Sequence, residues 1–215
     1  MDRWWRINRT LIEKLQDTGY EVPAVAVAEV ASLASFRLAF PDAVADPASM
    51  ERVFYPRAGT IAELRAPNGV LLGFGFSEGK HILTGEVTRL LNKLQEQNVT
   101  TCFYTVNKPV YHKAMEYIRE AQAIYRIVVF RQEQLAFNIS RHRRVPRHVL
   151  LPPAEASTWL ATTQLKRSQL PRIFEDDPMA KYYDAQPTEL MRVINPSPTV
   201  GSYARILVVV RRLVR

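Results

Sequence analysis

The hydrophobic pattern at the amino terminus predicts two helices. Apolar residues follow Asp2 at helical intervals: Trp4, Ile7, Leu11 and Leu15. This spacing predicts an amphipathic helix that Asp2 caps and that ends near Gly19. The Ala- and Val-rich run at residues 25–40 predicts a second helix, which Pro41 ends because proline cannot continue a helix.

Further along, short apolar runs alternate with amphipathic segments. Strands are expected at residues 50–55, 61–65, 70–76, 100–106, 125–130 and 135–139. Residues 81–97 predict a helix with one apolar face, and Asn107 is expected to cap another helix that begins at Lys108-Pro109. Alternating strands and helices are typical of an α/β layer. We expect this layer to end near His142.

A second, smaller α+β domain is predicted after the layer. Helices are expected from Glu155 towards Ala161 and then up to Leu170, where Pro171 ends the second one. Asp177 is placed to cap a short helix with Pro178 in its first position, and Tyr182 lies one turn further on.

Two strands are expected to complete this domain. Residues 189–194 predict one strand, residues 195–201 a turn in which Gly201 supplies a positive φ, and Tyr203 opens the second strand. The second strand is apolar at every position of 206–210, so both of its faces should be covered. Because two strands rarely supply two covered faces, we expect a partner.

The composition shows that the chain is basic. The chain has 215 residues, 47% of them hydrophobic, with a net charge of +8, which favours an acidic partner such as nucleic acid. Ordinary solvated Lys and Arg residues are the other interpretation of this charge. We expect domains at residues 1–143 and 144–215. Their net charges of +3 and +5 mark neither as a dedicated nucleic-acid arm. The basic stretch 141–148 between them suits either a phosphate contact or a solvated linker.

The sequence lacks the common catalytic and cofactor motifs. The only cysteine, Cys102, lies in an apolar run, which predicts a buried thiol and excludes a disulfide framework and a cysteine-based zinc site. The four histidines lack the helical spacing of a metal site, and no phosphate-binding loop or nucleophile elbow occurs. We therefore expect no catalytic residue, no metal and no cofactor. No apolar stretch is long enough for a membrane span, so we expect a soluble intracellular protein.

One group of residues suits a different chemistry. Asp42, Glu78 and Lys80 are the residue types of a metal-dependent nuclease, in which carboxylates hold a divalent ion and a lysine stabilises charge. The alternative interpretation is a turn with ordinary surface charges, because Asp42 is expected at a helix end rather than on a strand beside Glu78.

The carboxyl-terminal third resembles a known family. The resemblance rests on four segments: Leu170-Pro171-Arg172-Ile173, Asp177-Pro178-Met179-Ala180-Lys181-Tyr182-Tyr183, Arg192-Val193-Ile194 with Pro196-Ser197, and Gly201-Ser202-Tyr203. Their spacing resembles the C-terminal domain of the common subunit 5 of eukaryotic nuclear DNA-directed RNA polymerases, a domain equivalent to one of the small subunits of archaeal RNA polymerase. A looser match extends through residues 145–149 to Trp5-Arg6-Ile7 and Gly19-Tyr20.

The resemblance implies a non-catalytic polymerase subunit in the nucleus. Its N-terminal domain would be a jaw with a nuclease-like fold beside downstream DNA, where Lys108 and Pro109 match the segment that approaches DNA. A plain helix cap is the other interpretation of these two residues. The C-terminal assembly domain would dock on the largest subunit, near other small subunits, without forming a homo-oligomer. The residues expected to serve assembly are Pro171, Arg172, Asp177, Pro178, Tyr182, Pro196, Gly201 and Tyr203.

The chain also departs from the family pattern. The departures are Gln186, Pro187 and Thr188 in place of two basic residues and a glycine, Asn195 in place of arginine, Pro198 in place of glutamate, and Ile206-Leu207 in place of Tyr-Arg. They suggest a diverged copy that serves a specialised polymerase or belongs to a distant lineage. The alternative hypothesis is a free-standing DNA-binding or nuclease-like protein.

Overall fold

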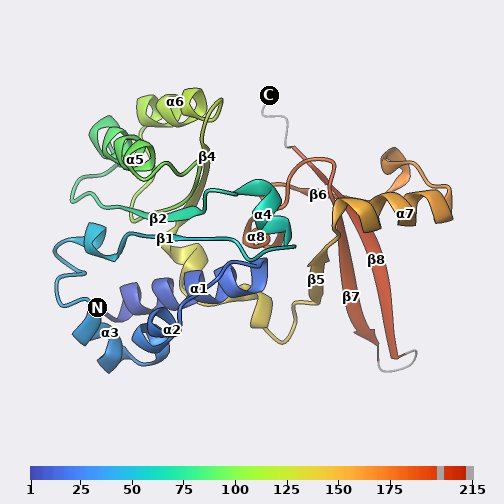
Figure 1. Ribbon diagram of the computed structural model, residues 1–215, viewed down its shortest axis with the longest axis horizontal. Helices are drawn as coiled ribbons and strands as arrows, with labels where there is room; N and C mark the ends of the chain where they lie inside the picture. Colours follow the sequence, from blue (N-terminus) through green and yellow to red (C-terminus); the bar gives the residue numbers. More distant parts are fainter. Residues whose placement is uncertain (198–200, 212–215) are drawn as a thin grey trace. The chain divides into compact units, whose positions relative to one another are not determined.

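The computed structural model describes residues 1–197 and 201–211, which form two units, Met1–Phe137 and Asn138–Arg215 (Figure 1). This division falls six residues before the boundary expected from the sequence. Asn138 belongs to the second unit, where its Nδ2 donates a hydrogen bond to Tyr182 Oη at 3.0 Å. The basic residues that follow Asn138 therefore belong to the second unit as well.

The two units differ in charge when they are divided in this way. Residues 1–137 contain 16 basic and 15 acidic residues, for a net charge of +1, whereas residues 138–215 contain 13 and 6, for a net charge of +7. The basic excess of the chain is therefore concentrated in its second unit, which the division at residue 143 partly concealed.

The first unit opens with three helices: α1 (Asp2–Thr18), α2 (Ala24–Ala31) and α3 (Leu33–Ala39). Helix α1 ends at Gly19 in the left-handed region, with φ 95°, as predicted. The single helix expected at residues 25–40 is wrong. Ser32 is extended there, and its hydroxyl caps α3 by accepting a hydrogen bond from the Ser35 amide at 3.1 Å.

A four-stranded sheet forms the middle of this unit. The strands are β1 (Arg52–Phe54), β2 (Val70–Gly75), β3 (Thr101–Val106) and β4 (Arg126–Arg131), in spatial order β1-β2-β3-β4. Strands β2, β3 and β4 are parallel, and β1 is an antiparallel edge strand. These four strands were predicted, with bounds that differ by one or two residues.

Two other predicted strands are wrong. Residues 61–65 form the helix α4 (Ile61–Arg65). Residues 135–139 run from the end of one 3-10 turn, η2 (Gln132–Leu135), to the start of the next, η3 (Ile139–Arg141). Segments of five residues do not distinguish a strand from a helical turn, because they are too short to show a helical period of 3.6 residues. A further 3-10 turn, η1 (Pro47–Met50), precedes β1.

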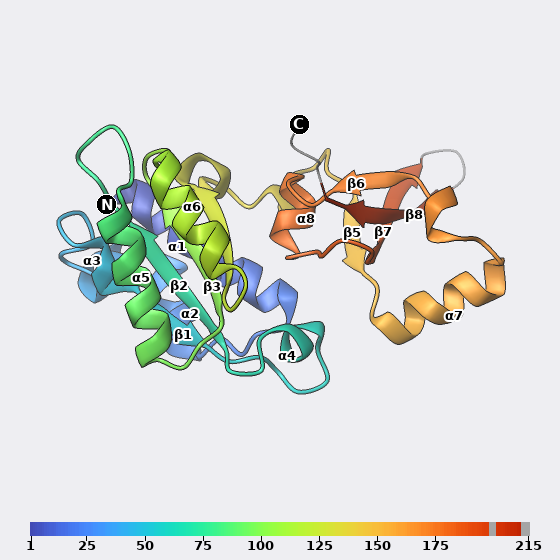
Figure 2. The same cartoon turned by 90° about the horizontal axis from the view of Figure 1, so that it is seen from above.

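Helices cover both faces of this sheet (Figure 2). Strand residues Leu72, Phe74 and Phe103 pack in a core with α1, α2 and α3. On the opposite face, Leu71 and Tyr104 pack with α5 (Thr84–Glu96) and α6 (His112–Ala121). The alternation of adjacent residues between the two cores follows the period of two along a strand. The expected α/β layer is confirmed.

The second unit is built on another four-stranded sheet. Its elements are β5 (Arg147–Leu150), α7 (Pro153–Thr163), η4 (Arg167–Gln169), β6 (Arg172–Phe174), α8 (Pro178–Tyr182), β7 (Leu190–Ser197) and β8 (Gly201–Val210). The spatial order is β5-β7-β8-β6, and only the β6–β8 pair is parallel. The predicted pair of strands thus has two additional neighbours.

Several predictions for this unit need correction. The second helix expected before Pro171 is only the turn η4, and Asn195 and Pro196 belong to β7 rather than to a turn. Ser197 also belongs to β7. Residues 198–200 of the predicted turn, which include Pro198, lie outside the described residues, and Gly201 opens β8.

The apolar strand β8 is covered on both faces over part of its length. Val208 is 5% exposed and packs with Leu151, Leu170 and Leu190, while Val209, on the opposite face, is fully buried. Ile206 and Leu207 are half-buried. The chain itself therefore buries Val208 and Val209, and the expectation that covering this strand requires a partner is wrong at these residues.

The packing of Gly75 gives a first prediction. A Cβ atom at Gly75 would clash with the Oη atom of Tyr104, which is buried in the core. We expect Gly75→Ala to lower the free energy of unfolding by about 1–3 kcal/mol because the tyrosine has to move. Urea unfolding of purified protein measures this change.

Gly85→Ala is the matched control for this substitution. Gly85 lies in α5, and a Cβ atom there would have no neighbour within 4 Å. This variant should gain up to about 1 kcal/mol, because alanine restricts the unfolded chain. Equal effects of the two substitutions would contradict the close approach of Tyr104 to Gly75.

Candidate functional site

Two loops meet where the parallel strands β2 and β3 end. Residues 76–83 join β2 to α5, and residues 107–111 join β3 to α6. The carboxyl ends of parallel strands are a common location for binding sites, because the loops there converge from several strands. We call these two segments the clipped loop pair.

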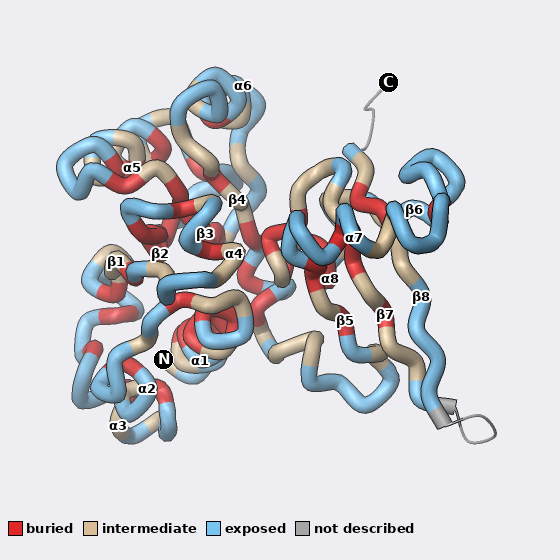
Figure 3. Tube along the Cα trace, turned by 45° about the vertical axis from the view of Figure 1, so that its right-hand side comes forward, coloured by how far each residue is buried: buried red, intermediate tan, exposed pale blue. Residues whose placement is uncertain are grey.

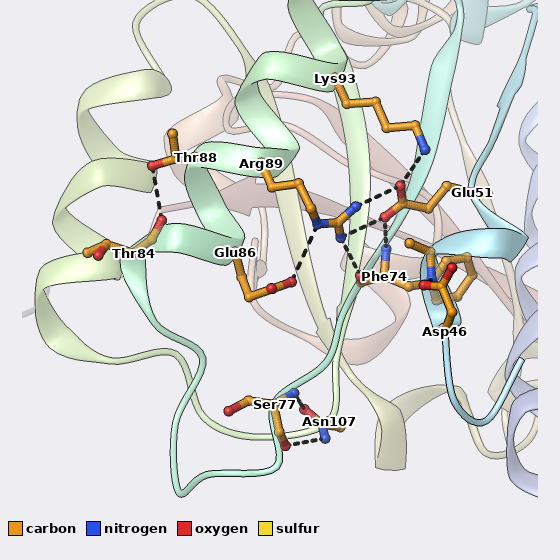
Figure 4. A network of polar contacts seen from close by, with 11 residues as sticks. Asp46, Glu51, Phe74, Ser77, Thr84, Glu86, Thr88, Arg89, Lys93 and Asn107 are labelled. Atoms are coloured by element: carbon orange, nitrogen blue, oxygen red, sulfur yellow. Dashed lines mark hydrogen bonds and ion pairs between the residues drawn. The ribbon is translucent and has the colours of Figure 1, made fainter.

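Asn107 holds the two loops together. Its Oδ1 accepts a hydrogen bond from the Ser77 amide at 3.1 Å, and its Nδ2 donates to the Ser77 carbonyl oxygen at 2.9 Å (Figure 4). The side chain thus satisfies both backbone groups of one residue in the neighbouring loop, as a paired strand would. The expectation that Asn107 caps a helix is wrong.

A second connection lies a few residues further on. The Ile82 amide donates to the Pro109 carbonyl oxygen, and the Tyr111 amide donates to the Ile82 carbonyl oxygen, both at 3.0 Å. Lys108 and Pro109 therefore lie, exposed, between two connections to the other loop. Helix α6 begins only at His112, so Lys108 does not stand at a helix N-terminus. The helix dipole thus gives no support to a phosphate contact by this lysine.

The clipped loop pair and the start of α6 expose cationic and aromatic side chains. These are Lys80, His81, Lys108, Tyr111, His112 and Lys113. The rings of His81 and Tyr111 make an edge contact, with centroids 5.9 Å apart. Lysines suit phosphate oxygens, and exposed rings suit bases or sugars. Glu78 is also exposed in the first loop, so the positive charge there is partly balanced.

A buried carboxylate lies beneath these loops (Figure 4). The Glu51 side chain is 0% exposed, and it accepts hydrogen bonds from both terminal nitrogens of Arg89, from Lys93 Nζ at 2.6 Å and from the Phe74 amide at 3.0 Å. Arg89 also donates to the Phe74 carbonyl oxygen at 3.0 Å. Helix α5 is thereby tied to β2. The burial of Arg89 lowers its pKa, but the hydrogen bond and charge of Glu51 outweigh this effect, so the pKa is raised.

Two nearby groups that could ionise are kept neutral. Burial raises the pKa of the Cys102 thiol, and the charge of Glu51 adds to that effect. Burial, and then the charge of Glu86, raises the pKa of Tyr104 in the same way. Cys102 is fully buried, as the sequence predicted, and neither group is poised to act as a nucleophile at neutral pH.

The residues of the nuclease hypothesis are exposed. Asp42 lies in a turn after α3, and Glu78 and Lys80 lie in the first loop of the clipped loop pair. Among residues 1–197 and 201–211, no three His, Cys, Asp or Glu side chains are grouped so that they could hold a metal ion. These observations give the nuclease interpretation no support. Within the same part of the chain, no helix is both long and apolar enough to cross a membrane.

Several residues expected to serve assembly have a role within the second unit. Asp177 caps α8, because its carboxylate accepts a hydrogen bond from the Met179 amide at 2.8 Å, and Pro178 occupies the first helical turn, as predicted. Tyr182 is 4% exposed. The Pro171 carbonyl oxygen accepts a hydrogen bond from the Val208 amide at 2.9 Å.

Other expected assembly residues lie at the surface. Arg172 is exposed on β6, and Tyr203 is 49% exposed on β8. Pro196 is exposed on β7, opposite Ser202 of β8, and Gly201 is paired with Ser197. The surface residues are thus those of the β7–β8 hairpin and of β6.

Comparison with known proteins relates the second unit to a known domain. Residues 137–209 match the family described as RNA polymerase Rpb5, C-terminal domain. These residues therefore resemble that domain. The matched segment begins one residue before the second unit and includes most of it, and all the assembly residues expected from the sequence lie within this Rpb5 domain.

The similarity to Rpb5 proteins extends beyond this domain. Proteins of Caenorhabditis briggsae and Caenorhabditis elegans, both named DNA-directed RNA polymerases I, II, and III subunit RPABC1, are each 29% identical to this chain over 210 residues. These matches cover 97% of this chain and 96% of each relative. A Dictyostelium discoideum protein of the same name is 39% identical over 74 residues, which are 34% of this chain and 38% of that protein.

The role of Asn107 in the clipped loop pair was missed by sequence reasoning. An asparagine after a strand and before Lys-Pro has the composition of a helix cap, and nothing in the local pattern indicates a partner 30 residues away. Pairing of Asn107 with a backbone segment becomes visible only once β2 and β3 are known to be parallel neighbours.

The connection through Asn107 can be tested directly. We expect Asn107→Ala to speed amide hydrogen exchange in residues 76–83 by about tenfold, because the loss of hydrogen bonds worth about 0.5–1.5 kcal/mol each favours local opening. Exchange followed by mass spectrometry of peptides measures this change.

Ser77→Ala is the control for that experiment. The connection uses only the backbone of Ser77, whose hydroxyl accepts a separate hydrogen bond from the Gly79 amide. Exchange at residues 107–111 should therefore stay at the wild-type rate in this variant. If Ser77→Ala loosened both loops as much as Asn107→Ala, the asparagine would not be the link between them.

Proposed function

We propose that this chain is a non-catalytic subunit of a multisubunit DNA-directed RNA polymerase and acts in the nucleus during transcription. The observation that carries the proposal is the similarity to proteins named as subunits of RNA polymerases I, II and III over 97% of this chain and 96% of those relatives. Both units therefore have a counterpart in the relatives, and the alternative of a free-standing nuclease has no comparable support.

In this proposal, the second unit is the assembly domain and docks on the largest subunit near other small subunits. Support comes from its charge and its surface. The unit has a net charge of +7, and Arg172 and Tyr203 are exposed on neighbouring strands of its sheet. The roles of Asp177 and Tyr182 in this domain are to hold α8 and the segment at Asn138, so they serve assembly through the fold.

The first unit is proposed to be a jaw beside downstream DNA. Its net charge of +1 does not favour general binding to DNA, so contact would be local. The clipped loop pair supports such a contact, because Lys80 and Lys108 are exposed on loops that two connections hold in place. A fixed lysine loses less side-chain and loop entropy on binding a phosphate than one on a mobile loop.

Purification from the organism's own cells tests the proposal. We expect the tagged protein to bring down a complete RNA polymerase at high salt, with one copy of this chain per assembly. Mass spectrometry of every co-purified chain, with quantified stoichiometry, is the measurement. If the protein were recovered alone or only as a homo-oligomer, the proposal would be wrong.

The same experiment addresses the hypothesis of a diverged copy. The departures at Gln186, Pro187, Thr188, Asn195, Pro198, Ile206 and Leu207 all lie within the Rpb5 domain. If they specialise the chain, one class of polymerase should be recovered in large excess over the others. Equal recovery of every nuclear polymerase would instead favour a shared subunit, like the named relatives.

The proposed DNA contact predicts an effect of Lys108→Glu in the assembled polymerase. The substitution should weaken the binding of a template with downstream duplex about two- to fivefold, and it should reduce the slope of log affinity against log salt by about one unit, because one phosphate contact is lost. Competition of elongation complexes at several salt concentrations measures both quantities.

Lys166→Glu provides the matched control, because Lys166 is an exposed lysine of the second unit, outside the proposed jaw. Its salt slope should equal that of the wild type. If the two variants behaved alike, the clipped loop pair would not be the site of a specific DNA contact.

A further inference from the structure

Strand β8 is paired unequally along its two edges. On one edge, β7 pairs with it from Gly201 to Val208, in an unbroken antiparallel ladder. On the other edge, β6 pairs only with residues 208–210. The part of this second edge between Ser202 and Leu207 therefore extends beyond the end of β6. We call this part the β8 outer edge.

The direction of the backbone groups follows from hydrogen bonds at the paired end. The Val208 amide points to the β6 side, where it donates to the Pro171 carbonyl oxygen at 2.9 Å. Val209 points the other way, because its amide donates to the Glu189 carbonyl oxygen at 2.9 Å. Backbone groups alternate in direction along a strand. The N–H and C=O groups of Ser202, Ala204 and Ile206 therefore point outward.

Proline ends the pairing with β6. To continue the parallel ladder by one step, residue 171 would donate its amide to the Ile206 carbonyl oxygen, but Pro171 has no amide hydrogen. Upstream, the chain turns away through η4. Over residues 1–197 and 201–211, no backbone group pairs with the outward groups of Ser202, Ala204 and Ile206.

On the opposite side of the sheet, the edge of β7 is protected against pairing with another chain, unlike the β8 outer edge. Strand β5 pairs with β7 as far as Ile194, and the next outward position of β7 is Pro196, which also lacks an amide hydrogen. Proline at an edge is a common device against pairing with another chain. The β8 outer edge has no such device, since Ser202, Ala204 and Ile206 are small or apolar residues that keep their amides.

The surroundings of this edge are exposed and basic. Residues 202–205 are exposed (Figure 3). Arg205 lies over the Tyr203 ring, 5.9 Å from its centroid, and it forms no ion pair with any residue that the structure describes. Tyr203 supplies apolar surface beside the unpaired backbone. An incoming strand would thus meet backbone donors and acceptors, a ring and a positive charge.

We propose that the β8 outer edge takes up an extended, acidic segment of another polypeptide chain as an additional strand of the sheet, in line with β6. The inference rests on the proposed function, in that the segment belongs to another subunit of the polymerase. Backbone hydrogen bonds supply the affinity in this kind of recognition, and side chains supply the specificity. Arg205 meets an acidic residue of the segment, which suits the net charge of +7 on this unit.

Ala204→Pro tests the role of the backbone. The substitution removes an outward amide without touching the ladder to β7, and edge strands tolerate proline. We expect recovery of the polymerase with the tagged protein to fall at least tenfold at high salt. Ala204→Val is the matched control, because it enlarges the side chain at the same position but keeps the amide, and its recovery should remain within twofold of the wild type.

Cross-linking from Tyr203 gives a second measurement that does not depend on how the proline variant folds. A photoreactive phenylalanine derivative in place of Tyr203 should cross-link, within the purified polymerase, to one short segment of another subunit that contains acidic residues. The same derivative in place of Tyr117, an exposed residue of α6, should not label that segment.

The outcomes separate this inference from the proposed function. If wild-type protein brings down the polymerase and Ala204→Pro does so equally well, the inference about the edge is overturned while the function stands. Cross-links from position 203 only to a second copy of this chain or to nucleic acid would overturn it as well. If even the wild type brings down no polymerase, the proposed function itself is wrong.

Discussion

The first unit depends on a negative charge that has no access to water. A buried carboxylate is costly unless donors replace the water it has lost, and Glu51 receives hydrogen bonds from Arg89, Lys93 and the backbone of Phe74. These donors come from helix α5 and strand β2, so the requirement to satisfy one side chain fixes the helix against the sheet. The loop between them is thereby anchored at both ends, and the neighbouring loop is connected to it through Asn107.

The sequence predicted the regular elements that have a long or strongly apolar pattern. Helix α1 and strands β2, β3 and β4 have long or fully apolar patterns, and all four were found. The failures are short segments, where other interactions decide the conformation. At Ser32 a side-chain cap divides a predicted helix. At residues 61–65 a segment of only five residues forms a helix instead of a strand.

The sites were harder to predict than the fold because they depend on pairings between distant segments. Arg172 and Tyr203 were expected to serve assembly and are exposed. Strands β5 and β6, which set the extent of the sheet, were not predicted. Each has only three or four residues, and each gains its stability from neighbours far along the chain. Without β5 and β6, the sequence predicted only the pair β7 and β8, so the position of the unpaired edge could not be located.

The two ends of β8 differ in burial, and this difference affects where the sequence of such a chain can change. Near its end, Val208 and Val209 lie in the core, where most substitutions reduce stability. Residues 202–205 are exposed, and substitutions there usually change the free energy of unfolding by less than about 0.5 kcal/mol. After a gene duplication, mutations could therefore accumulate in the distal half of the hairpin and alter partner choice while the fold persists. One strand thus combines a segment under stability constraint with a segment open to evolutionary change.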